Sequence, residues 1–102
     1  MRAIVCNEYA SPAGLTVSEL PAPTPKPNEV LVNIKATGLG YVDALTVAGL
    51  YQVKPKLPFV PGNEISGVVA EVGSEVNNLQ VGQRILAMPS YGGLAEQVCI
   101  AA

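Results

Sequence analysis

Gly38-Leu-Gly-Tyr-Val-Asp-Ala-Leu-Thr-Val-Ala-Gly-Leu-Tyr51, followed by Pro58-Phe-Val-Pro-Gly-Asn-Glu-Ile-Ser-Gly67, is the stretch that decides the fold. Its first half predicts one short helix over 41–48, in which apolar residues recur at helical spacing. Gly49 stands where helices commonly end in a left-handed glycine. The second half is stiffened by prolines and places Asn63 and Glu64 directly before an apolar run. Such rigid segments on both sides of one small helix predict a region that holds side chains at the rim of a site.

Short strand-like segments make up most of the remaining sequence. Apolar patterning predicts strands over 2–6, 15–20, 29–37, 65–72, 81–87 and 94–100. In the third of these, Val30, Val32, Ile34 and Ala36 are expected on one face. Prolines at every other position of 21–27 predict an extended crossing segment, because proline cannot donate to a sheet ladder. This pattern predicts one mainly β domain over 1–102, a partly open barrel with one or two short helices.

Composition narrows the class of protein. Charged residues are 14% of the chain, against about 25% in a typical soluble domain. Apolar residues are 49%, which fits either an ordinary all-β domain or a domain that covers a partner surface. The net charge is −2 and there is no basic cluster, so we expect no nucleic-acid partner. No apolar stretch approaches the ~20 residues that span a bilayer, and the start does not resemble a signal peptide, so we expect a cytoplasmic protein without a membrane partner.

The chain has two cysteines, Cys6 and Cys99, each in an apolar strand-like run. Their positions leave a disulfide open. We favour two buried reduced thiols, as is usual in a cytosolic protein.

The stretch quoted above resembles the amino-terminal, GroES-like domain of the medium-chain dehydrogenase/reductase superfamily, in particular its zinc-free quinone oxidoreductase branch. The resemblance extends over essentially the whole chain. The run Gly67-Val-Val-Ala-Glu-Val-Gly73 followed by Val81-Gly-Gln-Arg-Ile-Leu86 also resembles the co-chaperonin GroES, which bears on the fold alone. The resemblance implies a GroES-like barrel that supplies one wall of an active site, with the nucleotide-binding domain absent from this chain.

The ligands of a catalytic zinc are missing. The chain has no histidine, so a His-ligated metal and a Ser–His–Asp relay are excluded within it. By the resemblance, zinc-dependent relatives carry a histidine at the position of Asn63 and a cysteine close to Gly40. Here the sequence reads Gly62-Asn63-Glu64, and the Gly38–Gly40 turn has no cysteine. We therefore expect no metal. A dinucleotide-binding Gly-x-Gly-x-x-Gly between a strand and a helix is also absent.

Five side chains and one glycine are the candidates for a site. By the resemblance, Gly40 and Tyr41 border the cofactor, and Tyr51 and Asn63 line the substrate pocket, with Tyr51 as the catalytic phenol or, alternatively, a packing residue. Asp43, in the first helical turn, and Glu64, before a buried strand, are expected to be structural carboxylates. The sequence departs from the family pattern at Gly40, where an asparagine is usual, and at Val47, where an arginine is usual.

The resemblance implies the substrate-side domain of an oxidoreductase that transfers hydride from NADP, with NAD possible, to a quinone, enone or carbonyl compound. The cofactor would be held mainly by a C-terminal Rossmann domain, and the longer protein would be a homodimer. An isolated fragment is expected to be inactive. Two alternatives are a stand-alone co-chaperonin-like assembly module and a zinc-independent alcohol dehydrogenase with another substrate.

Overall fold

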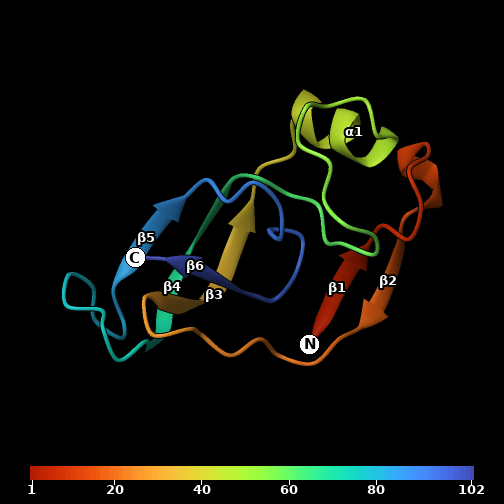
Figure 1. Ribbon diagram of the computed structural model, residues 1–102. Helices are drawn as coiled ribbons and strands as arrows, with labels where there is room; N and C mark the ends of the chain where they lie inside the picture. Colours follow the sequence, from red (N-terminus) through yellow and green to blue (C-terminus); the bar gives the residue numbers. More distant parts are fainter.

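Six strands in two sheets, one α-helix and one 3₁₀ helix form the structure, a computed structural model that describes residues 1–102. In chain order the elements are β1 (Arg2–Val5), η1 (Pro12–Gly14), β2 (Thr16–Glu19), β3 (Glu29–Thr37), α1 (Tyr41–Ala48), β4 (Ile65–Val72), β5 (Arg84–Ala87) and β6 (Gln97–Ala101). One sheet pairs β1 with β2, and the other has the order β5-β4-β3-β6. The helix α1 lies at one end of both sheets (Figure 1). This is the predicted mainly β fold, and the barrel does not close.

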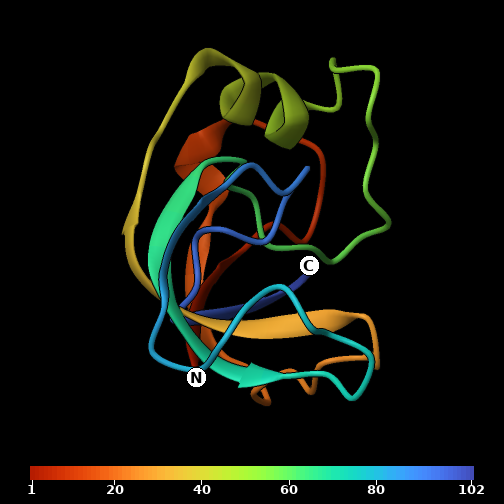
Figure 2. The same ribbon diagram turned by 90° about the vertical axis from the view of Figure 1, so that its left-hand side faces the viewer.

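The long strand β3 forms the centre of the larger sheet, because it pairs antiparallel with both β4 and β6. Figure 2 shows how strongly β3 and β4 curve. Val30 and Val32 are fully buried as predicted, but Leu31 is buried too and Ala36 is exposed. The strict alternation predicted for this strand is therefore wrong. Register shifts lie between Leu31 and Val32 and between Ile34 and Ala36, and such bulges turn the following residues away from a simple alternation.

Two small apolar clusters hold the domain together. The first joins β3 and β4 through Val30, Val32, Ile65 and Val69. The second joins the chain after β1 to the helix and to the loop before β4 through Cys6, Val47 and Phe59. The second cluster matters for function, because it fixes α1 and the following loop to the sheets.

Two predicted strands begin later than expected. The strand β5 starts at Arg84 instead of residue 81, because Gly82 adopts φ 90° in a turn. The strand β6 starts at Gln97 instead of residue 94, because Leu94 makes its backbone hydrogen bonds with Ile4 and Pro61 outside the large sheet. The segment 21–27 forms no regular element, as its prolines predict. Neither helix has the length and apolar character needed to cross a membrane.

Candidate functional site

The helix α1 begins at Gly40, whose backbone is extended at φ −136° and ψ 176°. The Gly40 N–H donates a hydrogen bond of 2.9 Å to Oδ2 of Asp43, which is only 8% exposed. Glycine cannot cap the helix with a side chain, so the Asp43 carboxylate organises the first turn instead, where it also lies favourably at the positive end of the helix dipole. The structure thus places Asp43 in the support of the helix.

Backbone and side-chain contacts also fix the C-terminal end of α1. Gly49 is left-handed at φ 75°, and its N–H bonds to the carbonyl of Thr46. The ring of Tyr9 lies against Gly49, where an added Cβ would be 3.0 Å from it. The Tyr9 hydroxyl also donates a hydrogen bond to the carbonyl of Pro55. Tyr9 therefore contacts both the end of the helix and the loop that follows it.

Tyr51 and Asn63 line one cavity of about 190 Å³, which we call the Tyr51–Asn63 cavity. The rest of its lining is Val42 of α1, Val53, Met88, Pro89 and Ser90. The side chains of Tyr51, Asn63 and Ser90 have no hydrogen-bond partner within the protein and carry no charge. A mostly apolar hollow with a few free polar groups is the usual form of a small-molecule site. The structure therefore brings together the two residues that the sequence assigned to a substrate pocket.

The sequence analysis did not identify three of the lining residues, Met88, Pro89 and Ser90, as members of the site. They follow β5, whose last residue, Ala87, pairs with Ile65, so the chain beyond it leaves the sheet at the end where Asn63 lies. Only the pairing of β4 with β5 brings these residues close to Asn63. The sequence pattern did not reveal this pairing, because it does not determine the register between two strands.

Gly40 does not line this cavity. It borders a second, largely apolar hollow of about 480 Å³, which we call the Gly40 hollow. Its other lining residues are Ile4, Pro12, Leu15, Leu39, Asp43, Ala44, Val47, Pro61 and Leu94. Tyr41 is 78% exposed and lines neither space. The structure therefore does not bring Gly40 and Tyr41 into one cavity with Tyr51 and Asn63.

Glu64 is an exposed residue whose carboxylate makes no hydrogen bond within the protein, so the structure gives it no bonded structural role. Its side chain covers Gly38, where an added Cβ would lie 2.6 Å from Oε1. The contact that ties this turn to β4 is the backbone bond of 2.9 Å from the Gly38 N–H to the Glu64 carbonyl.

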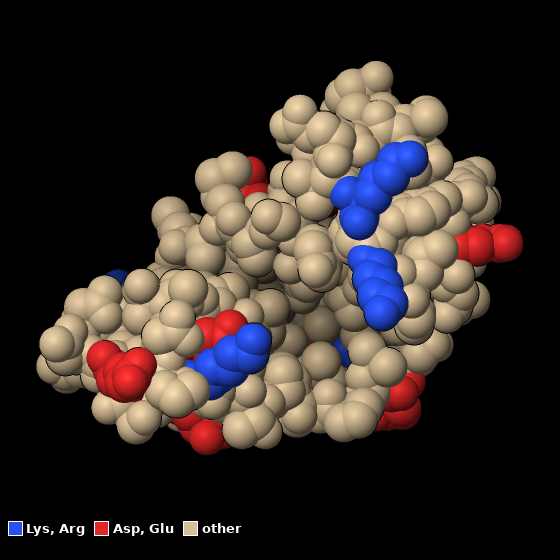
Figure 3. All heavy atoms as spheres, in the orientation of Figure 1, with Lys and Arg blue, Asp and Glu red and all other residues tan.

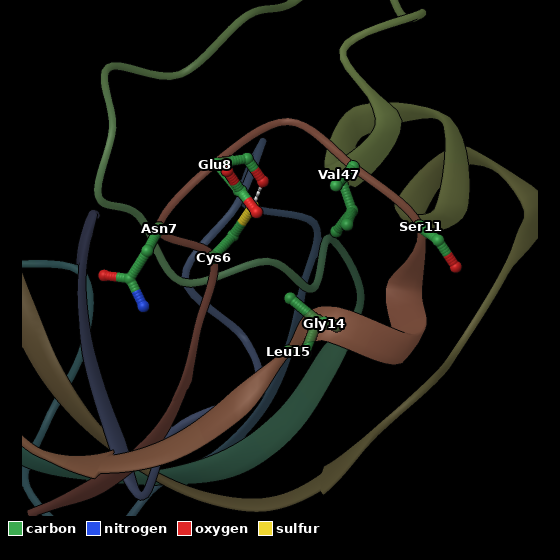
Figure 4. A pocket seen from close by; sticks show the side chains of 8 residues that line it. Cys6, Asn7, Glu8, Ser11, Gly14, Leu15 and Val47 are labelled. Carbon is green, nitrogen blue, oxygen red and sulfur yellow. Dashed lines mark hydrogen bonds between the residues drawn. The ribbon is translucent and has the colours of Figure 1, made fainter.

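The two cysteines are not bridged, and Cys6 is buried as expected. Cys99 is only half-buried, so the expectation of two buried thiols is wrong for it. Cys6 is 1% exposed and donates a hydrogen bond of 3.1 Å to the carbonyl of Glu8 (Figure 4). Burial raises the pKa of the Cys6 thiol, and burial followed by the charges of Glu29 and Glu71 raises the pKa of the Cys99 thiol. No group of three or more His, Cys, Asp or Glu side chains is placed to hold a metal.

The raised thiol pKa values predict a loss of stability at alkaline pH. Because the folded state holds these protons more tightly than the unfolded chain, the contribution is fully present below the ordinary thiol pKa of about 8.5 and is lost as pH rises through the raised folded-state pKa. Urea denaturation across this range should show a steeper decline for the wild type than for the double variant Cys6→Ala, Cys99→Ala. Parallel declines would contradict the assignment.

Charged residues are sparse on the surface. On the face shown in Figure 3, charged side chains are few, and two basic side chains lie side by side.

Comparison with known proteins places the chain in a family. The profile of the alcohol dehydrogenase GroES-like domain matches residues 26–102. Quinone oxidoreductase-like protein 2 of Rattus norvegicus is 44% identical over 100 residues, which are 97% of this chain and 27% of that protein. An alcohol dehydrogenase of Rhizobium meliloti is 40% identical over 85 residues, or 83% of this chain and 24% of that protein. The crystal structure of Escherichia coli quinone oxidoreductase complexed with NADPH superimposes with a TM-score of 0.92 at 30% identity.

That superposition covers 99% of this chain and 31% of the Escherichia coli enzyme. The chain thus spans between about a quarter and a third of the length of these three relatives. The sequence match, the open β fold and the near-complete superposition agree with one another. The chain belongs to the family of alcohol dehydrogenase GroES-like domains, and its relatives are oxidoreductases that include quinone oxidoreductases.

Proposed function

We propose that this chain is the substrate-side domain of an NADPH-dependent oxidoreductase that transfers hydride to quinones, enones or other conjugated carbonyl compounds. The observation that carries the proposal is the Tyr51–Asn63 cavity, in which free hydrogen-bond donors face an uncharged, mostly apolar space. Relatives named as quinone oxidoreductases support the reaction class. A zinc-independent alcohol dehydrogenase is the second candidate, because the Rhizobium meliloti relative bears that name.

The residues at the helix entrance fit a nicotinamide. Nothing lies within 4 Å of the position where a Gly40 side chain would begin, so a flat ring can approach the backbone there. The exposed ring of Tyr41 offers an aromatic face beside it. The related Escherichia coli quinone oxidoreductase was crystallised with NADPH, which supports NADP as the cofactor. NAD is the alternative cofactor. When bound, this cofactor supplies the hydride. We propose that a Rossmann domain in a longer chain holds most of it.

The side chains of this domain would position the acceptor and exclude water. The Tyr51 hydroxyl is proposed to donate a hydrogen bond to an acceptor oxygen, and the Asn63 amide can supply a second donor. The apolar lining strengthens such bonds because it excludes water. Glu64 lies outside the cavity, so no acid–base role is assigned to it.

Further parts of the proposal concern the whole protein. The free thiols are typical of a reducing compartment, which supports a cytoplasmic location. The size of the cavity supports a small-molecule substrate. By resemblance to the family we also propose a homodimer, without nucleic-acid or membrane partners.

Tyr51→Phe in the full-length enzyme tests the function. Loss of the hydroxyl should lower kcat/KM for NADPH-dependent quinone reduction about tenfold, or roughly 1.4 kcal/mol of transition-state stabilisation. Steady-state kinetics would measure it. The matched control is Tyr91→Phe, because the Tyr91 ring packs edge-on against Phe59 outside the cavity. Equal kinetics for Tyr51→Phe and the control would demote Tyr51 to a packing residue.

A further inference from the structure

An open groove of about 620 Å³ crosses β3, β4 and β5, and we call it the Lys35–Arg84 groove. Ile65 and Val69 of β4 belong to the first apolar cluster, so Ser66 and Val68, which alternate with them, lie on the opposite face of the sheet and line the groove. The groove shares no lining residue with the Tyr51–Asn63 cavity or the Gly40 hollow, and it is larger than both. Its volume is that of a small-molecule site.

The pairing of the strands determines where the side chains of the groove lie. In the antiparallel pairing of β4 with β5, Ser66 is opposite Leu86 and Val68 is opposite Arg84. Lys35 lies at a register shift of β3, where it has no paired residue on β4. A bulge of this kind redirects a side chain from the simple alternation of a strand. Lys35 from β3 and Arg84 from β5 therefore flank the same stretch of β4.

The two cationic side chains of the groove have no acidic partner. Lys35 and Arg84 are both exposed, and the one ion pair of the structure joins the Met1 ammonium to Glu19. None of the eight Asp and Glu residues lines the groove. Neighbouring strands are about 4.8 Å apart, so β3 and β5 are separated by roughly 10 Å, and two long side chains can reach one group above β4. A single anion can therefore contact both cations.

Apolar surface and one hydroxyl complete the groove. Leu86 is 85% exposed, and Val68 and Ile85 are half-buried. The Ser66 hydroxyl can donate a hydrogen bond to an anion, and the guanidinium of Arg84 matches a carboxylate or a phosphate with two parallel bonds. An exposed ion pair alone binds weakly because water competes, but contact with apolar side chains adds a hydrophobic contribution. The groove therefore complements an anion with an apolar chain better than a bare inorganic ion.

We propose that the Lys35–Arg84 groove is a second small-molecule site, which binds amphiphilic anions with one carboxylate or phosphate headgroup and an unbranched alkyl chain. Lys35 and Arg84 bind the headgroup, with Ser66 as a further donor, and Val68 and Leu86 contact the chain. The site is independent of the proposed function, because none of its residues lines the Tyr51–Asn63 cavity.

The test is calorimetric titration of the full-length protein with octanoate, octyl phosphate, octanol and inorganic phosphate, in the absence of NADPH and quinone. Octyl phosphate should bind at least about tenfold more tightly than octanol, which lacks the charge, and than inorganic phosphate, which lacks the chain. Lys35→Gln and Arg84→Gln should each weaken binding of both octyl anions about two- to fivefold, and the double variant about tenfold. Lys54→Gln is the matched control, because Lys54 is an exposed lysine outside the groove.

Equal affinities of the wild type and the double variant for the octyl anions would overturn the inference, as would the absence of binding to the wild type. Octanol that binds as tightly as octyl phosphate would also overturn it, because the charges would then contribute nothing. Vesicles of phosphatidylcholine and phosphatidylglycerol distinguish a lipid surface from a soluble ligand. Sedimentation with these vesicles without binding of the free anions would contradict a small-molecule site. No readout involves turnover, so a failure of the proposed function leaves these results unchanged.

Discussion

Gly67→Ala is expected to lower the free energy of unfolding by about 3 kcal/mol, at the upper end of the cost of overpacking a core. An added Cβ at Gly67 would lie 2.4 Å from the carbonyl oxygen of Asn33 and 2.6 Å from Cγ1 of Val32. Neither atom can move cheaply, because one belongs to the backbone of β3 and the other to a fully buried side chain. Relief would require separation of β3 from β4, which is the centre of the larger sheet.

Urea denaturation followed by circular dichroism measures this effect. Gly14→Ala is the matched control, since nothing lies within 4 Å of its added Cβ and its backbone is not left-handed. We expect the control to stay within about 0.5 kcal/mol of the wild type. Equal unfolding midpoints for the two variants would contradict the close approach of β3 to β4 at Gly67.

Phe59→Ala should cost about 3–4 kcal/mol, as is usual for loss of a buried aromatic side chain. Phe59 is buried with Cys6 and Val47, and its ring contacts those of Tyr9 and Tyr91 at centroid distances of 6.1 and 5.9 Å. Phe59 therefore links Tyr9 to Tyr91. Tyr9 holds the loop after the helix, and Tyr91 directly follows Ser90 of the cavity. Truncation should loosen both sides of the Tyr51–Asn63 cavity as well as the fold.

Leu86→Ala is the control, because it removes a large apolar side chain that is already exposed. The denaturation midpoint of Phe59→Ala should be clearly lower than that of Leu86→Ala. In the full-length enzyme, Phe59→Ala should also raise KM for the acceptor more than KM for NADPH, since it acts on the walls of the acceptor cavity. A stable Phe59→Ala protein with unchanged acceptor KM would contradict the role given to this cluster.

The local parts of the fold could be predicted from the sequence because they depend on near neighbours. The helix 41–48 has a single apolar spacing and a terminal glycine, and its predicted bounds agree with the structure. The bounds of the strands over 29–37 and 65–72 agree as well. The exposure of Ala36 could not be predicted, because it depends on a bulge that only the pairing of β3 with β4 creates.

Part of the geometry of the candidate site could be predicted, and the roles of its residues stay predictions. Tyr51 and Asn63 lie on one continuous loop region, and the structure places them in one cavity. Gly40 borders a different hollow, which is also lined by Asp43, Ala44 and Val47 of the helix, whereas Val42 lines the Tyr51–Asn63 cavity. Met88–Ser90 could not be found, because they are brought to Asn63 by strand pairing across the chain.

The central claim is that the helix entrance at Gly40 faces a nicotinamide cofactor. Gly40→Asn tests it, because the extended backbone of Gly40 accepts any residue and there is open space for the side chain. Asparagine is also a favourable residue at the start of a helix, so the variant should fold at least as well as the wild type. Its amide can then donate a hydrogen bond to the cofactor, worth about 0.5–1.5 kcal/mol.

The direct measurement is a titration of the full-length enzyme with NADPH, with Gly40→Ala as the control that adds a side chain without a donor. We expect the dissociation constant of Gly40→Asn to fall by up to about tenfold relative to both the wild type and the control. An unchanged dissociation constant in a well-folded Gly40→Asn enzyme would mean that Gly40 does not border the cofactor, and would contradict the placement of the site.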